Sequence, residues 1–191
     1  KKTKASPYGS IDYPLNPPSL ALGAQATFVA RTIDRWQKHM AAMLERSYNH
    51  DGGSFIEIYQ NCNIFNDGAF EEYTGAEKFS NVIELKHGEP MVFAQGTKGI
   101  KLDGFKPKVV DMEKNSIDDI LIHNETDLDL AHIIANWTSH PTLPEPIGVI
   151  YCIDKTTYNQ DIVNQIESAI EAKGPGNVQD LLNSGDTWVV D

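Results

Sequence analysis

A strand, a helix and a second strand within residues 26–59 constrain the fold of this 191-residue chain more than any other feature. Residues 26–31 and 54–59 are short apolar runs, and residues 34–48 carry apolar side chains at spacings of three and four. Strands joined by a helix of this length pair in parallel through a right-handed crossover. Apolar runs without strict alternation indicate strands covered on both faces. The pattern therefore predicts an α/β fold, with residues 1–74 forming part of a doubly wound parallel sheet.

The remainder, residues 75–191, has a different character and is predicted to form a smaller α+β region with antiparallel hairpins. The dipeptide Asp103-Gly104 favours a tight primed turn between two short strands, and Asp127 is placed to cap a helix over residues 127–137. The other elements that we expect are a hairpin of strands 82–86 and 91–94, a central strand 147–153, a helix 159–172 that buries its apolar positions, a short helix 177–183 and an edge strand 187–190. The helix over residues 34–48 is expected to begin with Asp34 as its N-cap.

Composition excludes several classes of function. The net charge of −11 disfavours a nucleic-acid partner, because phosphate binding uses clustered lysine and arginine. No apolar run approaches the ~20 residues that a membrane-spanning helix needs. The first residues lack the apolar stretch of a signal peptide, so we expect a cytoplasmic protein with reduced cysteines and no membrane partner. The chain starts without methionine in a polar stretch, and we expect it to be part of a longer polypeptide.

Cysteine offers the most specific candidate chemistry. Cys152 lies in an apolar strand pattern and is expected to pack as a small hydrophobic side chain. Cys62 lies between Asn61 and Asn63, just beyond strand 54–59, at the edge where open α/β sheets assemble their sites. The residue types leave two alternatives for Cys62, a small half-buried side chain or a thiolate ligand to iron. Because iron–sulfur clusters normally take four thiolates, the second alternative requires three cysteines from elsewhere.

Three segments resemble the beta subunit of 2-oxoacid:ferredoxin oxidoreductases. Residues 15–31, LNPPSLALGAQATFVAR, carry the resemblance most densely. Residues 6–12, SPYGSID, and residues 58–70, IYQNCNIFNDGAF, are similar to the branch assigned to 2-oxoglutarate. The resemblance continues more loosely through residues 146–149 and 185–188. It implies that the chain is the carboxyl-terminal portion of such a subunit.

The family resemblance also implies cofactors and site residues. The beta subunits of that family bind thiamine diphosphate and Mg²⁺ on a doubly wound α/β domain and hold one [4Fe–4S] cluster. By that match Cys62 is the fourth cluster ligand, while the other cysteines and the metal-anchoring elements precede this segment. Ser6, Tyr8, Gly9 and Ser10 match a loop at the edge of the thiamine site, where a purely structural arm is the alternative reading.

The reaction implied by the resemblance is the oxidative decarboxylation of 2-oxoglutarate to succinyl-CoA, with ferredoxin as electron acceptor. The implied partners are the alpha subunit, ferredoxin, 2-oxoglutarate and coenzyme A. Two alternatives remain open: residues 75–191 serve as a subunit-assembly module without direct chemistry, or the substrate is pyruvate or another 2-oxoacid. This segment alone is expected to be inactive and to bind no thiamine diphosphate, because the metal-anchoring residues lie outside it.

Overall fold

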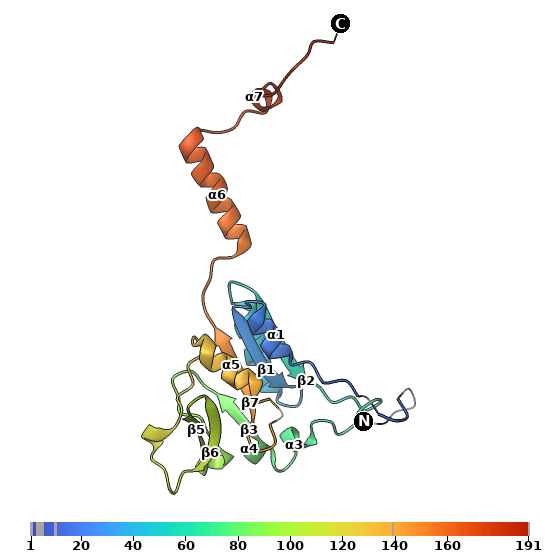
Figure 1. Cartoon of the computed structure of the whole chain (residues 1–191), viewed down its shortest axis with the longest axis vertical. Helices are drawn as coiled ribbons and strands as arrows, with labels where there is room; N and C mark the ends of the chain where they lie inside the picture. Colours follow the sequence, from blue (N-terminus) through green and yellow to red (C-terminus); the bar gives the residue numbers. More distant parts are fainter. Residues whose placement is uncertain (1, 3–5, 10, 139, 191) are drawn as a thin grey trace. The chain divides into compact units, whose positions relative to one another are not determined.

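The computed structural model describes residues 2, 6–9, 11–138 and 140–190. The chain forms two compact units, residues 1–154 and residues 155–191. The first unit contains a four-stranded sheet in the order β2-β1-β7-β3 and a three-stranded sheet in the order β4-β5-β6 (Figure 1). Among its described residues, the second unit has two helices and no strand.

The four-stranded sheet confirms the α/β class and the predicted strand–helix–strand unit. Strand β1 (Phe28–Ile33) pairs in parallel with β2 (Ser54–Tyr59), and β3 (Val82–Leu85) pairs in parallel with β7 (Glu145–Cys152). The sheet differs from a purely parallel one in a single pair, because β1 and β7 run antiparallel. Strands from both sides of residue 74 share this sheet, so the division proposed there does not coincide with a break in the fold.

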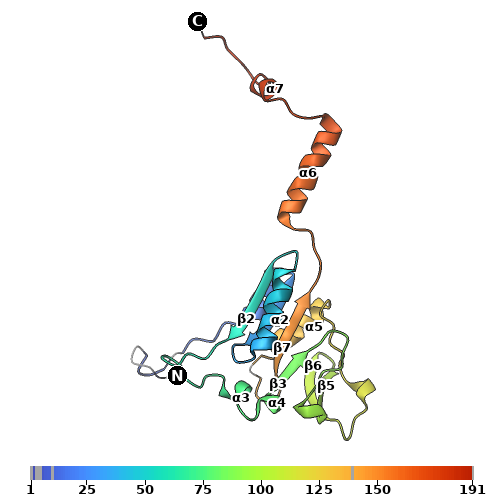
Figure 2. The same ribbon diagram turned by 180° about the vertical axis from the view of Figure 1, so that it is seen from behind.

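Helices cover both faces of this sheet, as the apolar strand patterns predict. Helices α1 (Pro17–Gly23) and α5 (Leu128–Asn136) lie on one face, and α2 (Gln37–Tyr48) lies on the other (Figures 1 and 2). All six residues of β1 are buried because the strand lies inside the sheet and is covered twice. Neighbouring residues of β1 accordingly pack on opposite faces of the sheet. Val29 packs in the cluster that contains α1 and α5 residues, whereas Phe28 packs with Met43 of α2.

The helix termini test the capping predictions. Asp127 caps α5 as expected, since its side chain accepts a hydrogen bond from the backbone N–H of Leu130 at 3.0 Å. The prediction that Asp34 caps α2 is wrong. That helix begins at Gln37, and Asp34 instead accepts a hydrogen bond from the backbone N–H of Asn61 at 3.0 Å.

The three-stranded sheet corrects one predicted hairpin and confirms another. The expected pairing of residues 82–86 with 91–94 is wrong, because β3 pairs with β7 and β4 (Val92–Phe93) pairs with β5 (Lys98–Asp103). The predicted turn at Asp103-Gly104 joins β5 to β6 (Lys106–Asp111), with Gly104 at a φ of +60°. The short elements of this unit are α3 (Glu71–Thr74), α4 (Lys78–Asn81) and the 3₁₀ turns η1 (Ala94–Gly96) and η2 (Ile117–Asp119).

The second unit contains α6 (Tyr158–Lys173) and α7 (Val178–Leu182). Both helices are predicted from the sequence, but the expected burial of the apolar face of α6 is wrong: none of its side chains is buried, and Val163, Ile166 and Ile170 are about half exposed. Residues 187–190 form no strand, contrary to expectation. Within the described residues, no helix is both long enough and apolar enough to cross a membrane.

Burial lowers the pKa of two histidines of the first unit, His123 and His39. The His123 side chain lies in the core, where its Nε2 donates to the carbonyl oxygen of Val149 at 2.8 Å. Its Nδ1 is buried and has no hydrogen-bond partner among the described residues. Burial lowers the pKa of His123, His87 lowers it further, and the Val149 carbonyl and Glu125 act in the opposite direction. Burial also lowers the pKa of His39 on α2, while Glu84 opposes that shift.

Because folding lowers the pKa of these histidines, we expect the stability of the first unit to fall in acid. A histidine whose pKa is lowered by folding is protonated first in the unfolded chain, so it destabilises the fold once the pH falls below the ordinary value of 6.5. We expect the buried His123 to contribute a loss of up to about 1.4 kcal/mol per pH unit below that value, and the half-buried His39 to contribute less because solvent screens its charge. Denaturant unfolding between pH 7.5 and 5.5 should show a shallower pH dependence for His123→Gln than for the wild type. The same substitution at exposed His140 should leave the slope unchanged, and an equal slope for His123→Gln would contradict the argument.

Candidate functional site: the loop that carries Cys62

Cys62 lies on a loop that leaves the carboxyl end of β2. Its side chain is half-buried, while the tip residues Ile64 and Phe65 are largely exposed. The carbonyl oxygen of Cys62 accepts a hydrogen bond from the backbone N–H of Asn66 at 2.8 Å, and the two residues form an isolated antiparallel bridge. The cysteine is therefore in an ordered turn at the sheet edge and is not enclosed in the apolar core.

Asn61 and Asp67 hold the two limbs of this loop together. The side-chain amide of Asn61 donates to Asp67 Oδ1 at 2.9 Å, and its Oδ1 accepts the backbone N–H of Gly68 at 2.9 Å. Gly68 has a φ of +75°, a conformation that glycine adopts without steric cost. The asparagine beside Cys62 thus closes the loop and connects it to Asp34 through its own backbone N–H.

Aromatic rings close the base of the same loop. Tyr59, the last residue of β2, stacks on Phe70 with ring centroids 4.5 Å apart and an interplanar angle of 7°. Tyr73 of α3 extends the stack, with its ring 6.0 Å from that of Tyr59. Burial raises the pKa of both phenols. They stay protonated at neutral pH and act here as packing and hydrogen-bonding groups.

A buried arginine fixes this aromatic base to the sheet. Arg31, on β1, is fully buried and donates from Nε to Glu57 at 2.7 Å and from Nη1 to Glu145 at 2.7 Å. Its guanidinium carbon lies 5.2 Å from the centre of the Tyr59 ring, and the Tyr59 hydroxyl donates to Glu145 at 2.9 Å. The arginine also donates to the Pro146 carbonyl and to the Thr138 hydroxyl. These contacts connect strands β1, β2 and β7 near the end of β2, where the loop begins.

Sequence reasoning missed this network. The signal was present, because Arg31 is a charged residue inside an otherwise largely apolar strand. Buried charges require partners, but the partner Glu145 is 114 residues away along the chain. No local pattern connects the two.

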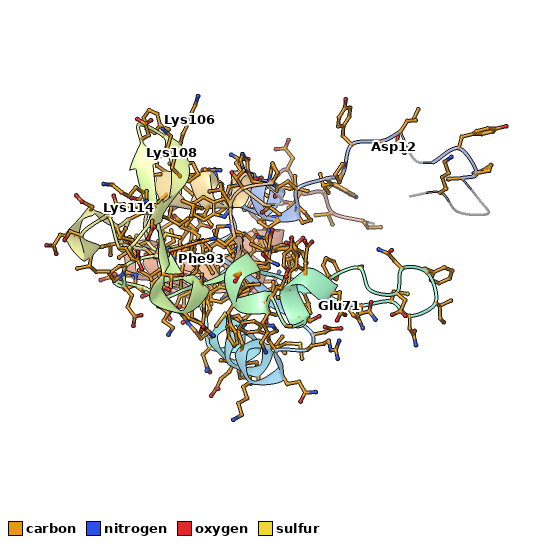
Figure 3. The ribbon with its side chains drawn as sticks, turned by 90° about the horizontal axis from the view of Figure 1, so that it is seen from below. Asp12, Glu71, Phe93, Lys106, Lys108 and Lys114 are labelled. Carbon is orange, nitrogen blue, oxygen red and sulfur yellow. The ribbon has the colours of Figure 1, made fainter. Side chains whose placement is uncertain are left out.

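The predicted thiamine-edge residues lie on the amino-terminal arm. The backbone N–H of Gly9 donates to the carbonyl oxygen of Ser6 at 2.9 Å, with Gly9 at a φ of +96°. Tyr8 is 94% exposed, and Ser10 lies outside the described residues. The arm and the Cys62 loop extend from the same end of the first unit, near the labels Asp12 and Glu71, while Lys106 and Lys108 lie on the opposite side (Figure 3). The structure brings the two segments to one end of the first unit.

The donor set present fits one part of an iron–sulfur site. Within the described residues, no three His, Cys, Asp or Glu side chains are grouped as a metal site requires. Neither described cysteine is in a disulfide. Burial raises the pKa of Cys152, whose Sγ lies 3.9 Å from His50 Nδ1, in keeping with a packing role. Cys62, in contrast, is only partly buried; one cysteine is a single donor, whereas an iron–sulfur cluster normally takes four thiolates.

Comparison with known proteins shows which proteins this chain is similar to. No family model matches the chain. It is 37% identical over its whole length to the 2-oxoglutarate oxidoreductase subunit KorB of Mycobacterium tuberculosis, of which it covers 52%. It is 34% identical over 67 residues to the beta subunit of a 2-oxoacid:ferredoxin oxidoreductase from Aeropyrum pernix, covering 35% of this chain and 21% of the relative.

A solved structure shows the same fold. The 2-oxoglutarate:ferredoxin oxidoreductase from Magnetococcus marinus, with 2-oxoglutarate, coenzyme A and succinyl-CoA bound, superposes with a TM-score of 0.64 at 17% identity. The superposition covers 98% of this chain and 50% of that one.

The similarity along the whole chain to a 2-oxoglutarate oxidoreductase subunit, and along part of it to beta subunits of 2-oxoacid:ferredoxin oxidoreductases, confirms the resemblance seen in its sequence. Within that family, its match along the whole chain is to a subunit of the 2-oxoglutarate type. The chain spans about half the length of that curated relative.

Proposed function

We propose that this chain is part of the beta subunit of an enzyme that converts 2-oxoglutarate and coenzyme A to succinyl-CoA and CO₂. Each turnover releases two electrons and one proton, and the electrons leave singly to ferredoxin. The similarity along the whole chain to a 2-oxoglutarate oxidoreductase subunit carries this proposal. The pairing with an alpha subunit, through residues 75–191, belongs to the same proposal.

In the intact subunit, the Cys62 thiolate would hold one iron of a [4Fe–4S] cluster, which supplies one-electron transfer. Thiamine diphosphate with Mg²⁺ supplies the decarboxylation chemistry when bound. Ser6, Tyr8, Gly9 and Ser10 would line the edge of that cofactor site. The structural support for the cluster role is the ordered, half-exposed position of Cys62 at the end of β2.

The proposal is tested on the full-length protein purified anaerobically with its companion polypeptides. We expect reduction of a viologen dye that depends on both 2-oxoglutarate and coenzyme A, with a higher kcat/KM for 2-oxoglutarate than for pyruvate. Cys62→Ser should lower the iron content and the activity by at least about tenfold, because a cluster lacking a ligand is lost or damaged. Cys152→Ser provides the matched control and should retain both.

Different results would separate the parts of the proposal. Full iron content and activity in Cys62→Ser would contradict the ligand assignment. A preference for pyruvate would contradict the substrate assignment and leave the reaction class intact. Activity independent of any 2-oxoacid would contradict the proposed reaction itself.

A further inference from the structure

We propose that Phe70 and Tyr59 are positioning residues, whose stacked rings close the base of the Cys62 loop and so set where its sulfur lies. This inference deepens the proposed function, in which that sulfur binds iron. Nothing in the loop's sequence suggests a role for Phe70, which lies eight positions after the cysteine. Its role follows from the geometry at the two ends of the loop.

Besides the bridge between Cys62 and Asn66, two sets of contacts hold the limbs of the loop together, one outer and one inner. The outer closure consists of the hydrogen bonds that Asn61 makes with Asp67 and Gly68. The inner closure is the pair of parallel rings, Tyr59 where the loop begins and Phe70 where it ends. Because the outer bonds lie at exposed residues, water competes with them. The half-buried ring pair is therefore the closure that restrains the loop more strongly.

The inner closure is also the one that is fixed to the sheet. Tyr59 is held on its face by the buried guanidinium of Arg31 and at its hydroxyl by Glu145. Phe70 has no polar atom in its side chain and is positioned by stacking on Tyr59 and Tyr73. Removing the Phe70 ring therefore frees the returning limb of the loop while leaving the buried charges paired.

The experiment measures the loop directly and then the cluster. In the full-length protein, prepared without its cluster, hydrogen–deuterium exchange is followed in the peptide that spans residues 60–70. We expect Phe70→Leu to speed exchange of the Asn66 and Gly68 amides by roughly three- to tenfold, because loss of the stacking contact favours local opening. Phe70→Tyr keeps the ring and should restore the wild-type rate. Ile64→Ala, an exposed position on the same loop, should change nothing.

The cluster-loaded protein supplies a second readout. Phe70→Leu should broaden the electron paramagnetic resonance signal of the reduced cluster, and Phe70→Tyr should restore it. Unchanged exchange in Phe70→Leu, or no rescue by tyrosine, would overturn the inference. If Phe70→Leu speeds exchange as expected while Cys62→Ser retains full iron, the loop closure holds and only the ligand assignment fails.

Discussion

Replacing Arg31 with methionine is expected to destabilise the first unit by about 3–5 kcal/mol, because it leaves buried carboxylates without their cation. Glu145 has 2% of its side chain exposed and lies 2.7 Å from Arg31. Glu57 is less enclosed, with 17% exposed, and can regain water more easily. Most of the loss should therefore arise at Glu145. Denaturant unfolding of the wild type and the variant at pH 7.5 measures the difference.

The control for this prediction is an exposed arginine in the same unit. Arg35 is 64% exposed and lies 3.9 Å from Glu71, a surface pair that is expected to contribute below about 1 kcal/mol. Arg35→Met should therefore be nearly neutral. Adding Glu145→Gln to Arg31→Met removes the carboxylate charge that Arg31 had neutralised. The double variant should recover part of the lost stability, since the two residues are in direct contact. Equal losses in the Arg31 and Arg35 variants would show that the buried network contributes little.

Local patterns predicted much of this fold. The strand–helix–strand unit of residues 26–59, the Asp127 cap and the Asp103-Gly104 turn are all present. Each depends on neighbours within a few residues, where periodicity, capping and turn chemistry act. The α2 start was misplaced because Asp34 bonds to Asn61, a partner that only the tertiary fold brings near.

Pairing between distant segments could not be predicted in the same way. Strand β3 satisfies the local signals for a hairpin, yet it pairs with β7, more than fifty residues later. The apolar periodicity of α6 correctly predicted a helix, but burial also needs a covering surface, which the sequence pattern does not supply. Cys62 was identified from its place after a strand, whereas the groups that hold its loop at the base, Arg31 and Glu145, come from separate strands.

Introducing alanine at Gly148 is the second substitution expected to have a large effect, with a loss of about 2–4 kcal/mol from combined backbone strain and overpacking. Gly148 has a φ of +110° within β7, a region that residues with a Cβ atom rarely occupy. An added Cβ would lie 2.7 Å from the carbonyl oxygen of Leu85 in β3. That oxygen belongs to the backbone of a paired strand, so it cannot move aside as a flexible side chain could.

The same residue explains why the sheet tolerates its irregular register. Gly148 lies opposite Arg31 on one side and Leu85 on the other, close to the point where the β1–β7 register shifts between Val29 and Ala30. A glycine here lets β7 bend and still pair with both neighbours. Gly23→Ala is the matched control, because nothing lies within 4 Å of its added Cβ; it should be neutral or stabilising by up to about 1 kcal/mol. If thermal unfolding shows the two variants to be equally stable, Gly148 is not required for the pairing of β7 with β3.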